Sequence, residues 1–275
     1  MKLTADQLSF YRDNGFLQLD NYFSDAEIGI LKAEIPNTIE ERSPRIILEN
    51  NGSIRSIFAP HFINPTFDRL SRLDRMVIPA EQMIGSSVYI HQYKINVKKG
   101  LQSDWWEWHQ DFPYWHIDDG IDKPDMVTVM LYLEDTNYLN GALLLIPQTH
   151  KLGIVQFQNK RLAHSENGGD SQDVHKPEYM SSLDSNIKFS VDHELVRSQS
   201  VEHGIVTASA GKGSVLFFHG NIFHASNSNL TAFDRNSVLI TYNSVNNRPA
   251  ESTKARPDFL ASRKCDAITE IEQDI

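Results

Sequence analysis

Segments that alternate apolar and polar residues, many of them β-branched, dominate the chain after residue 87. A period of two is typical of strands that bury one face. The segments are Val88–Val97, Met126–Leu133, Ala142–Ile146, Gly204–Ala208, Ser214–Phe218 and Ser237–Ser244. Turns join several of them without helices in between, and Gly211-Lys212-Gly213 is predicted to form a hairpin turn. This pattern favours an antiparallel barrel or sandwich over βαβ layers.

The N-terminal region has helical signals instead. Thr4-Ala5-Asp6-Gln7 and Ser24-Asp25-Ala26-Glu27 both fit the capping box, in which the first and fourth residues satisfy free N–H groups at a helix start. Gly15 and Pro36 are suited to end the two helices that follow. A third helix is predicted over Phe67–Ile84.

The chain is expected to form a single domain, because 275 residues can bury a large core and no Pro/Ser-rich linker divides them. Its parts would be a mostly helical region 1–85, a β core 86–250 and a C-terminal tail 251–275. Within the core, 156–200 is polar and has no periodicity. Loops of this length are usually functional or mobile. We expect a lid over a site, and a disordered surface insertion is the alternative.

Composition excludes several classes of protein. The formal net charge of −10 argues against a nucleic-acid partner, because phosphate binding needs clustered Lys and Arg. Cys265 is the single cysteine, so an internal disulfide and a Cys-based zinc cluster are excluded. No apolar run reaches the roughly 18 residues of a membrane span, and the start lacks the apolar stretch of a secretory signal. We expect a cytoplasmic protein that binds a small molecule, with no nucleic-acid or membrane partner.

Two His-x-Asp triplets are the first candidates for chemistry: His109-Gln110-Asp111 and His116-Ile117-Asp118. On an extended segment, residues i and i+2 point to the same side, so either triplet could present an imidazole and a carboxylate to one metal ion. A later histidine would complete the two-His-one-carboxylate triad of non-haem Fe(II) oxygenases. His219 and His224 both follow the apolar run 215–218, and spacing leaves both triplets and both histidines open.

Arg235 is a candidate for binding a carboxylate. Oxygenases that use 2-oxoglutarate need a cation for its far carboxylate, and the guanidinium fork pairs with a carboxylate bidentately. Arg235 comes 11 residues after His224, whereas the same offset from His219 falls on Leu230. A surface ion pair is the alternative role. The apolar strand at Ser237–Ile240 favours the buried anchor.

A longer run resembles a known family. The residues from Trp106 to Gly120, W-E-W-H-Q-D-F-P-Y-W-H-I-D-D-G, are similar to the Trp-His-x-Asp-Phe-x-x-Trp-His-x-x-Asp-Gly signature of the phytanoyl-CoA dioxygenase (PhyH) superfamily, in its ectoine-hydroxylase-like branch. Further segments match in the same order: Tyr89–Asn96, Asn140–Lys151, His219–Asn227 and Arg256–Ala261. The resemblance therefore covers most of the chain, and several ordered motifs are more specific than one triplet.

The resemblance implies a fold and a site. The fold would be mainly β with flanking α: a double-stranded β-helix, that is, a cupin-like jelly roll, with N-terminal helices. The implied Fe(II) ligands are His109, Asp111 and His224, while His116 and Asp118 become structural or supporting residues. 2-Oxoglutarate would be held by Arg235, helped by Asn96, Thr128, Ser226 and Trp106. Substrate-facing positions would be Gln92, Trp115 and Arg256.

Two departures from the branch lie on the substrate side. Pro113-Tyr114 stands where ectoine hydroxylases have Glu-Thr, and Lys94 replaces an expected arginine. Lys94 and Arg256 would suit an anionic or zwitterionic molecule, and Tyr114 and Trp115 could stack on an apolar or cationic part. Plain core packing is the alternative for both aromatic residues. We expect retained chemistry with a changed substrate.

The implied reaction uses Fe(II), 2-oxoglutarate and O₂ to hydroxylate an unactivated C–H bond, releasing succinate and CO₂, with ascorbate as reductant in vitro. Substrate candidates are an amino acid, an ectoine-like compound or an alkaloid such as deoxy-cylindrospermopsin. A carboxylate at Asp111 favours hydroxylation over halogenation, while desaturation and cyclisation start from the same hydrogen abstraction. Two alternatives belong to other classes: a metal-dependent hydrolase with the same ligands, and a non-catalytic binding protein on a degenerate oxygenase fold.

Overall fold

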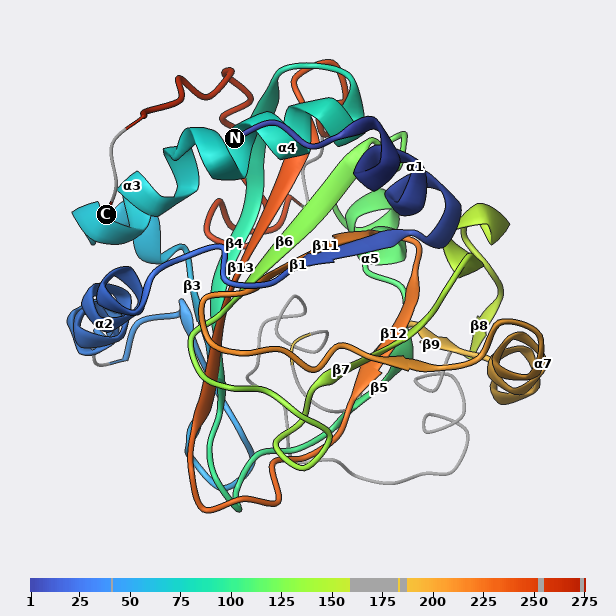
Figure 1. Cartoon of the computed structure of the whole chain (residues 1–275), viewed down its shortest axis with the longest axis horizontal. Coiled ribbons are helices and arrows are strands. Elements are labelled where there is room, and N and C mark those ends of the chain that lie inside the picture. Colours follow the sequence, from blue (N-terminus) through green and yellow to red (C-terminus); the bar gives the residue numbers. More distant parts are fainter. Residues whose placement is uncertain (41, 159–182, 184–186, 252–254, 273–274) are drawn as a thin grey trace.

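Two antiparallel sheets form the centre of the protein (Figure 1). The structure is a computed structural model that describes residues 1–40, 42–158, 183, 187–251, 255–272 and 275. The seven-stranded sheet has the order β1-β11-β6-β13-β4-β3-β2, and the six-stranded sheet has the order β10-β7-β12-β5-β9-β8. Apart from β2–β3–β4 and β8–β9, neighbouring strands come from distant parts of the chain, so several connections cross between the two layers. The expected mainly β jelly roll is confirmed.

The strands of the larger sheet are β1 (Phe16–Leu19), β2 (Ile46–Leu48), β3 (Ile54–Phe58), β4 (Val88–Lys98), β6 (Met126–Tyr132), β11 (Val215–His219) and β13 (Arg235–Ser244). Those of the smaller sheet are β5 (Trp106–His109), β7 (Leu143–Ile146), β8 (Phe157–Gln158), β9 (Ser190–Val191), β10 (Val206–Thr207) and β12 (Phe223–Ser226). Strand β6 is buried along its whole length, as its apolar sequence requires for a strand covered on both faces.

Helices cover the outer face of the larger sheet (Figure 1). They are α1 (Ala5–Asn14), α2 (Asp25–Glu34), α3 (Pro65–Arg72) and α4 (Asp74–Ile84), with the short α5 (Phe112–Ile117) and α7 (His193–His203) elsewhere. Short 3₁₀ helices span Ile35–Thr38, Pro60–Phe62 and Thr149–Leu152. Both predicted capping boxes are present, and Gly15 ends α1 in the left-handed conformation. None of the described helices has the length and apolar character that a membrane span requires.

The alternation of β6 separates two cores. Val127, Val129 and Leu131 point towards the helices and join the core that includes Phe67, Leu70 and Met76. Met130 and Tyr132 point to the other side, where they pack with Phe218, Leu239 and Leu145 between the sheets. The space between the sheets is therefore apolar at one end. Its other part holds the polar side chains described below.

The region 1–85, expected to be mostly helical, also contributes the short strands β1, β2 and β3, which extend both edges of the larger sheet. Two expectations for local structure were wrong. The helix predicted over Phe67–Ile84 is two helices, because Leu73 is extended and bridges Ile271 of the C-terminal segment. The turn at Gly211-Lys212-Gly213 does not close a hairpin, since β10 and β11 belong to different sheets.

The region 156–200 is partly ordered secondary structure rather than one loop. Strands β8 and β9 pair with each other, and β9 pairs with β5. The start of α7 lies within it, where Asp192 accepts hydrogen bonds from the N–H groups of Glu194 and Leu195. The predicted lid, and its alternative, fall on 159–182 and 184–186, which lie outside the described residues.

Candidate active site

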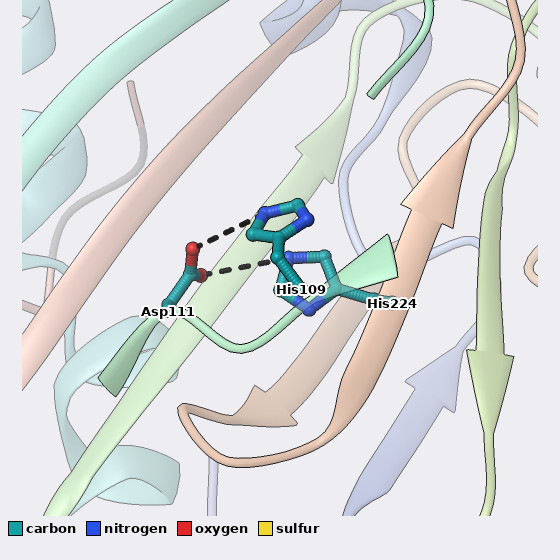
Figure 2. A group of neighbouring side chains, drawn as sticks. All are labelled: His109, Asp111 and His224. Carbon is teal, nitrogen blue, oxygen red and sulfur yellow. Dashed lines mark ion pairs between the residues drawn. The ribbon is translucent and has the colours of Figure 1, made fainter. Parts of the chain in front are cut away.

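Two histidines and one aspartate meet between the sheets (Figure 2). His109 ends β5, His224 lies on β12, and the two residues are direct partners in the β5–β12 ladder. The Nε2 atom of His109 lies 3.7 Å from Asp111 Oδ1, and Nε2 of His224 lies 3.8 Å from Asp111 Oδ2. The three donor atoms all lie within 4.8 Å of one another, so they can bind one metal ion together.

Backbone carbonyls set the tautomer of both histidines. Nδ1 of His109 lies 2.6 Å from the carbonyl oxygen of Glu107, and Nδ1 of His224 lies 3.0 Å from that of Ile222. A carbonyl oxygen only accepts, so each Nδ1 carries the proton and donates it. Each Nε2 then has a free lone pair facing Asp111. This is the state in which imidazole binds a metal ion.

The charges of the site also suit a metal ion. Burial lowers the pKa of His109 to about 3, an effect that His224 adds to and Asp111 opposes, so the imidazole is neutral at physiological pH. Burial disfavours the ionised form of Asp111, but His224, His109 and Lys94 outweigh it and lower the pKa of that carboxyl. Two neutral imidazoles and one carboxylate are the donor set of non-haem Fe(II) sites.

Asp111 reaches this position by a route that the sequence did not predict. The expected i, i+2 pairing assumed an extended segment, but Asp111 has helical dihedrals (φ −76°, ψ −38°) and directly precedes α5. Its side chain makes no hydrogen bond to the free N–H groups of that helix. The carboxylate oxygens therefore remain available on the side where the two imidazoles lie.

The competing candidates lie elsewhere. His116 donates from Nδ1 to the Ile121 carbonyl at 2.7 Å, and Asp118 forms an ion pair with Lys188 at 2.8 Å. His219 ends β11 and its ring lies 5.3 Å from that of His150, while its Nδ1 accepts the N–H of Asn221. Neither the second triplet nor His219 contributes a donor atom to the cluster of three.

A cavity that is partly open to solvent adjoins the cluster, and His109, Asp111 and His224 belong to its lining. Of the expected 2-oxoglutarate residues, Arg235, Asn96, Ser226 and Trp106 line it. Thr128 does not: it is buried on β6 and shares a hydrogen bond of 3.0 Å with Thr241 on the neighbouring strand. The expected role of Thr128 in binding 2-oxoglutarate stays a prediction.

Arg235 is 3% exposed and held by neutral acceptors. It donates to the carbonyls of Asn140 and Gly141 and, at 3.1 Å, to the hydroxyl of Ser237. Burial lowers the pKa of Arg235 to about 10, which still leaves it charged at physiological pH. No carboxylate of the described residues forms an ion pair with it, so the expected alternative, a surface ion pair, is not what the structure contains.

All five expected substrate residues line the same cavity: Gln92, Lys94, Tyr114, Trp115 and Arg256. They differ in whether their polar groups already have hydrogen-bond partners within the protein. Arg256 gives two hydrogen bonds of 2.6 Å to Asp119, whereas Lys94 has no hydrogen-bond partner among the described residues. Burial lowers the pKa of Lys94, and Asp111 opposes that effect. Lys94 thus brings an amino group into the cavity that makes no hydrogen bond or ion pair with the described residues and lies 5.9 Å from the centres of the Phe58 and Trp106 rings.

Several polar residues of the cavity were not expected. Arg55 pairs with Glu49 through Nη1 at 2.8 and 2.9 Å, and its guanidinium lies 3.7 Å from the centre of the Trp106 ring. Lys98 also lines the cavity, next to Arg235 in the β4–β13 ladder. The sequence carries a weak signal for both, because each is a charged residue that follows an apolar one within a strand: Arg55 follows Ile54 on β3, and Lys98 follows Val97 on β4.

Comparison with known proteins agrees with this geometry. Residues 11–237 match the family Phytanoyl-CoA dioxygenase (PhyH). An ectoine dioxygenase of Bordetella bronchiseptica is 34% identical over 270 residues, covering 95% of this chain and 83% of the relative. An L-proline trans-4-hydroxylase of Streptomyces griseoviridis is 31% identical over 265 residues, covering 96% and 94%. The crystal structure of EctD from S. alaskensis with 2-oxoglutarate and 5-hydroxyectoine has a TM-score of 0.80 at 27% identity, covering 98% and 87%.

The jelly roll and its His-Asp-His cluster define the class of 2-oxoglutarate-dependent non-haem iron dioxygenases. The chain belongs to the phytanoyl-CoA dioxygenase (PhyH) family, in the branch that contains ectoine hydroxylases. It is an enzyme that uses iron, 2-oxoglutarate and O₂, and its substrate is a small molecule. EctD has also been crystallised with bound Fe, and that structure has a TM-score of 0.76 to this chain.

Proposed function

We propose that this enzyme hydroxylates a C–H bond of a small zwitterionic metabolite that carries a carboxylate, such as an amino acid or an ectoine-like compound. The observation that carries the proposal is Lys94, which has no hydrogen bond or ion pair among the described residues and lines the same cavity as the cluster of His109, Asp111 and His224. The named activities of the relatives, on ectoine and L-proline, support a substrate of this size and charge.

In this proposal, His109, Asp111 and His224 hold Fe(II). The fit rests on the two Nε2 lone pairs and the free carboxylate that face one another. Bound iron supplies the activation of O₂, coupled to oxidation of 2-oxoglutarate to succinate and CO₂. The chain's own part is to present three ligands on one side and leave the other side open to the cavity. The Nδ1 hydrogen bonds select, for both imidazoles, the orientation in which Nε2 faces the metal site.

Arg235 would bind the far carboxylate of 2-oxoglutarate. Its hydrogen bonds to two carbonyls and one hydroxyl fix the guanidinium without neutralising it, so the charge remains available for a ligand. A guanidinium and a carboxylate form strong charge-assisted hydrogen bonds, especially where water is excluded. Asn96, Ser226 and Trp106 would form the walls beside the cosubstrate. The hydroxyl of Ser226 is buried without a partner, which suits a role facing a ligand.

Lys94, Gln92, Tyr114 and Trp115 would bind the substrate. Lys94 would pair with its carboxylate, and Gln92, whose Nε2 donates to the Leu260 carbonyl, retains a free carbonyl oxygen on its side chain. The indole of Trp115 offers a face for the cationic part. Arg256 keeps Nη1 and the second N–H of Nη2 for a ligand, because Asp119 engages Nε and one N–H of Nη2. Its larger role would be to form the wall.

A succinate-release assay with Fe(II), 2-oxoglutarate, O₂ and ascorbate tests the proposal. The substrate panel is L-proline, aliphatic amino acids, ectoine and zwitterionic alkaloids, and mass spectrometry detects the hydroxylated product. His109→Ala and Asp111→Ala are expected to abolish both succinate and product, because each removes a metal ligand. His116→Ala is the matched control, since it alters the other His-x-Asp triplet at an exposed position outside the cluster.

The result that contradicts the ligand set is full turnover by Asp111→Ala. Product formation without 2-oxoglutarate would instead support the metal-dependent hydrolase. Metal content of the purified variants, measured by mass spectrometry, provides a second readout: His116→Ala should bind iron as the unchanged enzyme does, and the two ligand variants should not.

A further inference from the structure

Two cations face each other behind the proposed 2-oxoglutarate site. Arg235 on β13 and Lys98 on β4 are direct cross-strand partners, and both line the cavity. Lys98 is 5% exposed and Arg235 is 3% exposed. Like charges directly opposite in a ladder repel one another, and burial increases the cost. A pair of this kind needs compensation that the two residues cannot give each other.

Among the described residues, only neutral groups accept hydrogen bonds from the two cations, while Glu49 and Asp104 near Lys98 and Glu134 near Arg235 act on them at longer range. The ammonium of Lys98 donates to the carbonyls of Asp104 at 3.0 Å and Asn227 at 2.6 Å. The guanidinium of Arg235 donates to carbonyls and one hydroxyl. No carboxylate of the described residues lies within ion-pair distance of either cation, and the nearby Glu49 is paired with Arg55. The pair therefore has no directly bonded anion among the described residues, and a carboxylate bound in the cavity would supply one.

Lys98 also shapes the loop that holds Arg235. Gly141 has φ +81°, and a Cβ at this position would lie 2.7 Å from Cδ of Lys98 and 2.5 Å from the carbonyl oxygen of Asn227. The stem of Lys98 thus packs directly against the glycine whose carbonyl accepts from Arg235. By binding Asn227 on one side and contacting Gly141 on the other, Lys98 connects the loop to β12.

We propose that Lys98 is a positioning residue for the cosubstrate: it fixes the Gly141 loop that cradles Arg235 and adds a second positive charge beside the far carboxylate of 2-oxoglutarate. The inference rests on the proposed role of Arg235. Burial and Arg235 both lower the pKa of Lys98, and a bound carboxylate opposes that shift. Binding of the anion and retention of the ammonium charge therefore favour each other.

The test is equilibrium binding of 2-oxoglutarate to the anaerobic Fe(II) enzyme by calorimetry, together with steady-state kinetics. Lys98→Met keeps a similar stem and removes the charge and both hydrogen bonds. We expect its Kd and KM for 2-oxoglutarate to rise at least about tenfold, equivalent to about 1.4 kcal/mol, with kcat and the KM for the organic substrate nearly unchanged. Lys98→Arg should recover part of the affinity, because it restores the charge.

Lys99→Met is the matched control. Lys99 is the next residue, is exposed, and pairs with Asp234 at 3.4 Å on the surface, so its loss should leave 2-oxoglutarate binding unchanged. If Lys98→Met does not fold, Lys98→Gln carries the same test, because it keeps a donor for the Asn227 carbonyl and lacks the charge. Affinity equal to that of the unchanged enzyme in either variant overturns the inference.

Arg235→Met separates this inference from the function on which it depends. If Arg235→Met weakens 2-oxoglutarate binding and Lys98→Met does not, the role of Lys98 is wrong and that of Arg235 stands. If neither variant weakens binding, the cosubstrate site itself has been misplaced. A loss of kcat and of affinity for both ligands together, with a lower Tm, would identify Lys98 as a general structural residue and also overturn the inference.

Discussion

The buried pair of Arg256 and Asp119 joins the C-terminal segment to the wall of the cavity. Nε and Nη2 of Arg256 each lie 2.6 Å from one oxygen of Asp119, which also accepts from Nε2 of His91 at 3.1 Å. Both side chains of the pair are buried. Asp119→Asn keeps the shape, removes the charge and places an NH₂ group against donors. Arg256 then remains buried without a counter-ion.

Removing one partner of a buried ion pair typically costs about 3–5 kcal/mol, because the remaining charge has lost its compensation. For a domain of this size, each kcal/mol lowers Tm by about 2–4 °C, so we expect a decrease of about 6–20 °C. Urea unfolding followed by circular dichroism gives the free energy of unfolding directly. The double variant Asp119→Leu/Arg256→Met removes both charges and should lose less stability than Asp119→Leu or Arg256→Met alone. The double-mutant cycle of these three variants measures the coupling energy of the pair.

The pH dependence gives an independent check. Burial disfavours the ionised form of Asp119, but Arg256 and the hydrogen bond from His91 outweigh it, and the pKa of Asp119 is lowered. A carboxyl with a lowered pKa in the folded state contributes stability above its unfolded pKa of about 3.9, and loses it as pH falls through the folded pKa. The difference in the free energy of unfolding between Asp119→Asn and the unchanged protein should be constant from pH 5 to 8 and shrink below about pH 4. A free-energy difference under about 1 kcal/mol at pH 7 would refute the reasoning.

Two further substitutions distinguish the ends of the cavity. Tyr114→Phe removes the oxygen that accepts the buried N–H of Phe189 at 3.1 Å, which should lower the free energy of unfolding by about 1–3 kcal/mol. We expect a higher KM for the organic substrate, whereas uncoupled 2-oxoglutarate consumption, measured by succinate release without substrate, should stay unchanged. Gly141→Ala forces an L residue to φ +81° and brings its Cβ into contact with Lys98, so the KM for 2-oxoglutarate should rise and Tm should fall, whereas a change in the organic-substrate KM alone would contradict both assignments.

The iron cluster could be predicted from sequence because a short motif specifies most of it. His109 and Asp111 are two residues apart, so any compact local backbone keeps them close, and the wrong assumption of an extended segment did not matter. The choice between His219 and His224 needed more than spacing. It depends on which strand lies against β5, and β12 does so while β11 pairs with β1 and β6. Resemblance to a family provided this pairing information, and periodicity could not.

Elements that depend on distant contacts escaped prediction. Strands β1 and β2 have only three or four residues and no clear alternation, so pairing with β11 and β3 creates them. The break between α3 and α4 arises from the C-terminal segment, whose Ile271 carbonyl accepts the N–H of Asp74. The same limit applies to the Arg256–Asp119 pair, which joins residues 137 positions apart. Nothing local in either segment marks its partner.

The two halves of the cavity are built by different means, and this bears on how substrate range changes within such a fold. Residues around the metal and the proposed cosubstrate site lie mainly on paired strands: His224 and Ser226 on β12, Lys98 on β4 and Arg235 on β13. Moving one of them would disturb a ladder that the whole sheet shares. On the substrate side, Tyr114 and Trp115 lie on α5 and Arg256 on the C-terminal segment, outside either sheet.

Segments outside the sheets can vary without breaking strand pairing, so substitutions there alter the substrate wall at a lower cost in stability. The departures from the ectoine-hydroxylase pattern fit this division only in part. Pro113-Tyr114 lies on α5, but Lys94 lies on β4, where Arg to Lys keeps the charge and shortens the reach of the donor. The departure at Lys94 on β4 thus keeps the charge and the strand, whereas the departure at Tyr114 on α5 introduces a phenol that contacts the Phe189 segment. Selection for a new substrate acts most freely where the sheet constrains the chain least.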